Sequence, residues 1–240
     1  MATSTESINT LIEGYTDLKS YFESVRDGIN VKVEALTASL SVTVYINGNV
    51  GSDEAAGGEE TPVRTMREAV SRVPVRGFGR IIFKTSVTMS EKIDTRASGL
   101  LFEAYPGVTP ALRSDWRVGD DTFLYPGQIN FAGSYGSVAF NGVGMHFEEK
   151  LAGTVGDDFE IGVFMTNSIT PPLFCGLFNC AITRDGGAAA FLISASSGTA
   201  TLNVATSVTF SSSMNGFWFA GIPSGTQSNL TRYNTNITSL

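Results

Sequence analysis

The first forty residues carry a narrow apolar stripe on an otherwise polar helical pattern. Successive members of the stripe alternate between steps of three and four residues, and they are Ile8, Leu11, Tyr15, Leu18, Phe22, Val25 and Ile29. This spacing is the heptad seam of a coiled coil, and it is narrower than the apolar face of a helix that packs on a globular core. Residues 1–41 are therefore predicted to form a helical segment for oligomerisation and attachment. A helix folded back on the rest of the chain is the alternative.

The size of the seam residues bears on the number of helices. Tyr15 and Phe22 are bulky for the seam between two helices and fit more easily around a wider axis. The seam therefore favours a coiled coil of three helices over one of two, and we expect a homotrimer.

From residue 42 the hydrophobic period changes from helical to alternating. The segment "SVTVYIN" alternates and is rich in β-branched residues, which predicts a strand. A loop rich in glycine and acidic residues follows. Thr61 is then expected to cap a helix whose first residue is Pro62 and which ends before Pro74. The segment "GRIIFKTSVTM" at 79–89 is expected to be a second strand.

This order of elements resembles a known family. The strand, the "GSD" and glycine-rich loop, the "TP" pair, the short helix ending in "VP" and the spaced "GFGRIIF" resemble the N-terminal entry unit of the pectate-lyase-like right-handed β-helix. That unit is common in bacteriophage tail fibres and tailspikes. The helix before it resembles the N-terminal helix of phage tail-fibre proteins, which assemble as trimers. The resemblance covers roughly residues 8–105. It implies a β-helix-like domain at 42–240, with its entry strand, loop and capping helix at 42–84.

The rest of the chain has the same β character without a fixed period. Short β-prone runs such as "GLLFEAY", "SVAFNG", "LFCGLFN" and "ATLNVA" are separated by glycine, proline or polar turns. The predicted fold is therefore mainly β: a right-handed parallel β-helix with irregular rungs, preceded by a coiled-coil helix. A β-sandwich-like arrangement of the C-terminal half remains an alternative.

Charge and hydropathy argue against nucleic acid and membrane as partners. The net charge of -7 leaves no basic surface for nucleic acid, and no apolar run is long enough for a membrane span. The N-terminus has no secretory signal, so we expect synthesis in a host cytoplasm. Between residues 161 and 240 the charged side chains are Arg184, Asp185 and Arg232 alone. So few charges favour association between copies of the chain.

Candidate chemistry is sparse. His146, the sole histidine, is expected on a strand where it can pair with Glu148 on the same face. The acidic clusters Asp120–Asp121, Glu148–Glu149 and Asp157–Asp158–Glu160 lie beside glycine-rich turns, where acidic residues favour turn formation. A catalytic carboxylate pair or a Ca²⁺ site at 157–158 is the less favoured interpretation. Cys175 and Cys180 are expected to be buried thiols. No catalytic residue, cofactor or metal is predicted.

The C-terminal region carries aromatic residues among neutral polar ones. Trp218 and Tyr233 are candidate receptor-binding residues, because aromatic faces beside hydrogen-bonding groups can dock on sugars or proteins. Strand alternation favours a different outcome, in which Phe217 and Phe219 point inward and Trp218 is exposed or packs on a sister subunit.

The resemblance implies a non-enzymatic structural protein of a bacteriophage virion. We expect a trimeric tail fibre, spike or tail-tip component that attaches by its N-terminal helices to other tail or baseplate proteins. It would contribute to tail architecture or bind a glycan or protein of the host surface. Two alternatives stay open: a polysaccharide-degrading tailspike, acting as a glycoside hydrolase or lyase, and a bacterial carbohydrate-binding surface protein.

Overall fold

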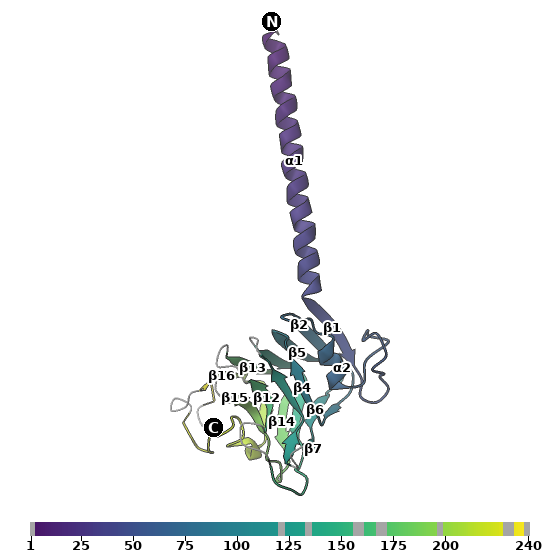
Figure 1. Cartoon of the computed structure of the whole chain (residues 1–240). Helices are drawn as coiled ribbons and strands as arrows, with labels where there is room; N and C mark the ends of the chain where they lie inside the picture. The colour runs from purple at the N-terminus through teal and green to yellow at the C-terminus, as the bar shows by residue number, and fades with distance from the viewer. Residues whose placement is uncertain are drawn as a thin grey trace. The chain divides into compact units, whose positions relative to one another are not determined.

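The chain forms two compact units, Met1–Leu40 and Ser41–Leu240, in a computed structural model (Figure 1). The residues described are 3–119, 123–132, 136–155, 161–166, 172–195, 199–227 and 233–237, and the backbone alone is described at 34–39. The first unit is one helix, and the second is built mainly of strands. The prediction of a mainly β chain with an N-terminal helix is therefore confirmed.

Helix α1 runs uninterrupted from Ser4 to Ser39. Thr3 and Glu6 form a capping box at its start: the Glu6 backbone N–H donates to Thr3 Oγ1 (3.4 Å), and the Thr3 N–H donates to Glu6 Oε2 (2.6 Å). The hydrogen bonds from Thr3 hold the pKa of Glu6 below its ordinary value. Within the described residues, neither helix has the run of apolar side chains that crossing a membrane requires.

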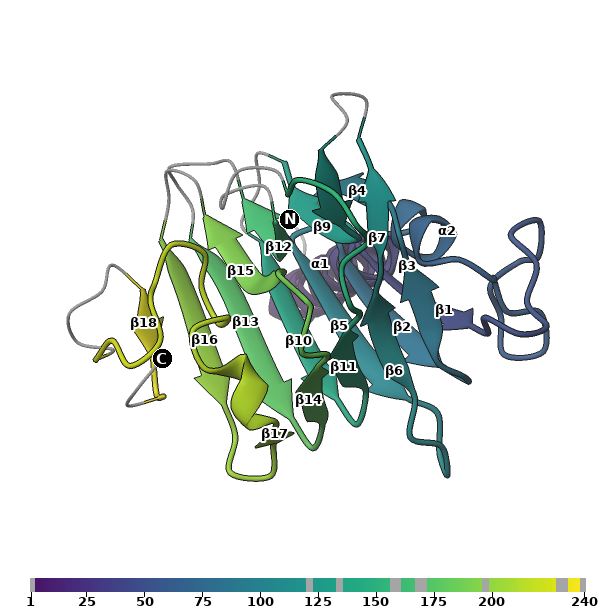
Figure 2. The same ribbon diagram turned by 90° about the horizontal axis from the view of Figure 1, so that it is seen from below.

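Three parallel sheets make up most of the second unit (Figure 2). The seven-stranded sheet has the order β1 (Ser41–Ile46), β2 (Phe78–Phe83), β5 (Gly99–Ala104), β10 (Ser137–Asn141), β13 (Leu173–Phe178), β16 (Ala200–Val204) and β18 (Asn234–Thr235). The five-stranded sheet has the order β17 (Thr209–Phe210), β14 (Ala181–Arg184), β11 (Gly144–Phe147), β6 (Ala111–Ser114) and β3 (Val87–Met89). The four-stranded sheet has the order β15 (Phe191–Ala195), β12 (Gly162–Thr166), β9 (Gln128–Phe131) and β4 (Lys92–Thr95).

The chain visits the three sheets in a repeating order. Strands β2, β3 and β4 lie in the seven-, five- and four-stranded sheets in turn, and β5–β6–β9, β10–β11–β12 and β13–β14–β15 repeat that order. Each strand pairs in parallel with its counterpart one pass later. The antiparallel pair β7 (Trp116–Val118) and β8 (Leu124–Pro126) is inserted between β6 and β9.

Two details of this topology correct the sequence analysis. The described C-terminal strands pair in parallel, whereas a β-sandwich is antiparallel, so the sandwich alternative is wrong for them. The segment at 79–89 is two strands, β2 and β3, in different sheets. Between β2 and β3 the chain leaves one sheet and enters the next. The sequence does not reveal this turn, because the residues on both sides of it are β-prone.

The core lies between the sheets, where inward-facing side chains of successive passes stack. Phe102 on β5 is fully buried, and its ring centroid lies 5.7 Å from that of Phe83, 4.9 Å from that of Phe140 and 6.4 Å from that of Phe164. Such ring pairs add to the stabilisation from burial. Stacked apolar rows therefore hold one pass against the next.

Helix α2 (Met66–Ser71) packs on β1 to β4 and buries Met66, Ala69 and Val70. The prediction that it begins at Pro62 with Thr61 as its cap is wrong. Val63 instead hydrogen-bonds with β1 in an extended conformation, because its N–H donates to the Tyr45 carbonyl (3.0 Å). The cap is Thr65, whose Oγ1 accepts from the Glu68 N–H (3.2 Å).

Candidate functional site

The outer face of the five-stranded sheet brings titratable side chains of three adjacent strands together. His146 on β11 is in register with Arg113 on β6 and with Thr183 on β14. Outward-pointing residues that share a register position stand side by side across a parallel sheet. Glu148 directly follows β11 and Asp185 directly follows β14, and the Asp185 N–H donates to the Phe147 carbonyl (3.0 Å). The strand register therefore places two carboxylates next to one imidazole.

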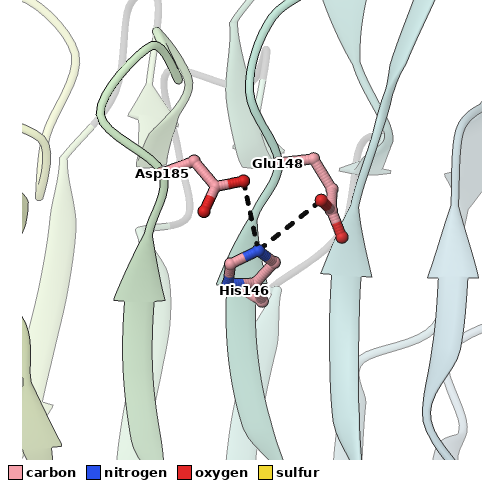
Figure 3. A group of neighbouring side chains, drawn as sticks. All are labelled: His146, Glu148 and Asp185. Carbon is pink, nitrogen blue, oxygen red and sulfur yellow. Dashed lines mark ion pairs between the residues drawn. The ribbon is translucent and has the colours of Figure 1, made fainter.

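The imidazole of His146 lies between the two carboxylates (Figure 3). Its Nε2 is 3.5 Å from Glu148 Oε2 and 3.5 Å from Asp185 Oδ2. The other ring nitrogen, Nδ1, is 2.8 Å from Thr183 Oγ1. The side chains of His146, Glu148 and Asp185 are 19%, 26% and 43% exposed, so the cluster is partly shielded from solvent but reachable. The predicted pairing of His146 with Glu148 is confirmed.

Neighbouring groups hold each carboxylate in place. Arg113 Nη1 donates to Glu148 Oε1 (2.7 Å), which leaves Oε2 directed at His146. The buried indole of Trp116 donates to the Glu148 carbonyl (3.0 Å) and fixes its backbone. On the other side, the Glu149 N–H donates to Asp185 Oδ2 (3.2 Å). The geometry is therefore set by contacts outside the cluster as well as within it.

This arrangement does not suit glycoside hydrolysis by Glu148 and Asp185. A catalytic carboxylate pair flanks open space that the scissile bond enters. Here the imidazole of His146 occupies the space between the two groups, and Glu148 is paired with Arg113. The cluster is better suited to holding a cation, because a histidine nitrogen and two carboxylate oxygens lie within 4.8 Å of one another.

The predicted oligomerisation residues lie together on one helix and are unburied. Their exposed fractions range from 40% to 77%, although all seven are large apolar side chains: Ile8, Leu11, Tyr15, Leu18, Phe22, Val25 and Ile29. Among the described residues of the unit Met1–Leu40, none covers the stripe.

The candidate receptor-binding residues are not at the surface. Trp218 is 1% exposed and packs edge-on against Phe210 at 5.2 Å between ring centroids. Tyr233 is 3% exposed and stacks on the buried Phe219 at 4.3 Å. The predictions that Trp218 is exposed and that these two side chains meet a receptor directly are therefore corrected. Alternation failed because residues 217–219 are not a regular strand. Phe219 forms an isolated bridge to Ile193, and two successive carbonyls, those of Phe217 and Trp218, accept from the Leu192 N–H (2.9 Å) and the Ile193 N–H (3.1 Å) of β15.

The other candidate residues fall into two groups. Asp120–Asp121 and Asp157–Asp158–Glu160 lie outside the described residues, and with them the possible Ca²⁺ site. Cys175 and Cys180 are buried free thiols, as expected. The sequence predicted no site role for Asp185, which is one of the few charged residues between 161 and 240. Its position beside His146 depends on the register of β11 and β14.

Comparisons with protein-family models, with curated proteins and with solved structures found no match to this chain. Sequence pattern and the geometry of the described residues are therefore the grounds for assigning a function.

Proposed function

We propose that the chain is a structural protein of a bacteriophage virion, a homotrimeric tail fibre, spike or tail-tip component. Helix α1 forms the trimer stem and attaches to other tail or baseplate proteins. The repeated passes through three sheets form a right-handed parallel β-helix that contributes to tail architecture or to contact with the host surface. A right-handed turn is supported by the general rule for crossovers between parallel strands of one sheet.

The observation that carries the proposal is the exposed seam of α1. A helix of 36 residues gains most of its stability from packing its apolar face, and Gly14 and Gly28 each weaken it further by about 1 kcal/mol. Burying a large apolar side chain is worth about 1.5–3 kcal/mol. Seven such residues, each more than a third exposed, therefore offer on the order of 10 kcal/mol per chain to association before entropy costs.

One feature favours three copies over two, and a second favours association between copies. Tyr15 and Phe22 occupy one of the two seam positions of the heptad, where bulky rings fit a wider axis more easily. The outer face of the seven-stranded sheet also carries exposed rings, Phe78, Phe174 and Phe178. Rings of this kind on a face with few charges are suited to burial between neighbouring copies.

The oligomeric state of the full-length chain tests the stem. We expect a trimer in sedimentation equilibrium, and we expect Leu18→Asp with Phe22→Asp to yield a monomer or an aggregate, because two charges per chain would be buried at the axis. The matched control is Ser20→Asp with Ser24→Asp, which adds the same charges at the same spacing outside the seam. A wild-type chain that stays monomeric at micromolar concentration, or a control that dissociates equally, contradicts the stem.

The location in the virion needs a separate experiment. Electron microscopy of intact phage particles that carry the labelled chain should show the label on the tail. A label found on the bacterial surface and absent from particles would favour a bacterial surface protein instead.

A further inference from the structure

We infer that His146, Glu148 and Asp185 form a binding site for a divalent transition-metal ion of the zinc class. This site is independent of the proposed stem, because all three residues lie on or directly after strands β11 and β14. A metal ion there would connect two successive passes of the chain.

The distances from His146 fit a shared metal ion as well as an ion pair. An imidazolium that hydrogen-bonds to a carboxylate has a nitrogen–oxygen distance of about 2.7–2.9 Å. Both distances from His146 Nε2 are 3.5 Å. In a tetrahedral zinc site with bonds of about 2.1 Å, neighbouring ligand atoms are about 3.4 Å apart. The observed spacing is that of an ion pair without a short hydrogen bond, and it also matches two ligands that share an ion.

The orientation of the ring also fits metal binding. When Nδ1 carries the proton, it donates to Thr183 Oγ1 at 2.8 Å, and the lone pair of Nε2 faces both carboxylates. Metal-bound histidines commonly donate their second ring N–H to an oxygen in this way. Three lone-pair atoms then face one another, and a metal ion between them removes their mutual repulsion.

The separation of the two carboxylates is the remaining requirement. One ligand atom from each of His146, Glu148 and Asp185 lies within 4.8 Å of the other two. Arg113 holds Glu148 Oε1 and the Glu149 N–H holds Asp185 Oδ2, which keeps both carboxylates beside His146.

The donor set selects the class of metal. Zinc binds histidine nitrogen and carboxylate oxygen, so one imidazole, two carboxylates and a water would complete its four ligands. Calcium requires six to eight oxygen ligands, and magnesium requires an octahedron mostly of oxygens, so an imidazole suits neither ion.

Zinc titration of the untagged, full-length chain tests this inference, and an affinity tag is avoided because His146 is the sole histidine. Calorimetry should show one zinc ion per chain, and a large excess of zinc should raise the melting temperature by several degrees. In ¹⁵N spectra of labelled histidine, zinc should shift Nε2 strongly and leave Nδ1 protonated. Magnesium and calcium should cause none of these changes.

The variants separate this site from other zinc binding. His146→Gln should abolish binding, and Asp185→Asn should weaken it about tenfold or more. Asn can still accept from the Glu149 N–H, so the second variant should keep its fold. Glu149→Gln is the matched control, since it removes a neighbouring exposed carboxylate and should leave the affinity unchanged. Absence of saturable zinc binding, or full affinity in both His146→Gln and Asp185→Asn, would overturn the inference.

Discussion

The stack of aromatic rings in the core predicts where the β unit is most sensitive to a cavity. Phe102→Ala removes a fully buried ring that contacts Phe83, Phe140 and Phe164. Deleting a buried Phe side chain costs about 3–5 kcal/mol, from lost transfer energy and from the cavity left behind. Three ring partners from two sheets limit the collapse of that cavity, so we expect a loss near the upper end, about 4–5 kcal/mol.

Urea unfolding of the full chain measures this loss. With a slope of about 3 kcal/mol per molar urea, the midpoint of Phe102→Ala should fall by more than about 1 M. All variants are compared at one protein concentration, because association of chains would shift the midpoint. Phe123→Ala is the matched control: this ring lies directly before β8, outside the seven-stranded sheet, and is 40% exposed, so its loss should cost much less. Equal midpoints for the two variants would refute the placement of Phe102 in the core.

Two further predictions concern the acid sensitivity of the entry loop and the reactivity of the thiols. Burial opposes the shift, but hydrogen bonds from Thr65 and Arg64 hold the pKa of Asp53 below its ordinary value of 3.8. Its contribution to stability is complete above that value and disappears as the pH falls through the lower folded pKa, so Asp53→Asn should flatten the acid loss of stability in urea titrations below about pH 4. A pH profile of Asp53→Asn identical to wild type would contradict this role. Burial raises the pKa of Cys180 to about 11 and also raises that of Cys175, so neither thiol should react with a disulfide reagent until urea unfolds the chain. Rapid labelling of the native protein would show that they are accessible.

Several elements were predictable because their signals are local. The heptad spacing from Ile8 to Ile29 lies within α1, and short β-prone runs between turns identified most strands of the seven-stranded sheet. The start of α2 was not predictable in this way. Asp53 accepts from the N–H groups of Arg64 and Thr65 and from Thr65 Oγ1 (2.8 Å), which places the cap at Thr65. That contact joins two ends of a loop, and no short window of sequence contains both.

The cluster of His146, Glu148 and Asp185 on the five-stranded sheet was also predictable only in its local part. His146 and Glu148 are two residues apart, so the period of a strand was enough to predict their pairing. Asp185 joins them because β11 and β14 pair with His146 opposite Thr183, and that register depends on every turn and core contact of the pass between them. The burial of Trp218 likewise depends on Phe210, which strand alternation around residues 217–219 does not include. The hydrophobic period depends on the backbone geometry of a few neighbouring residues. Strand register and burial depend on the free energy of the whole folded unit, to which residues far apart in the sequence contribute.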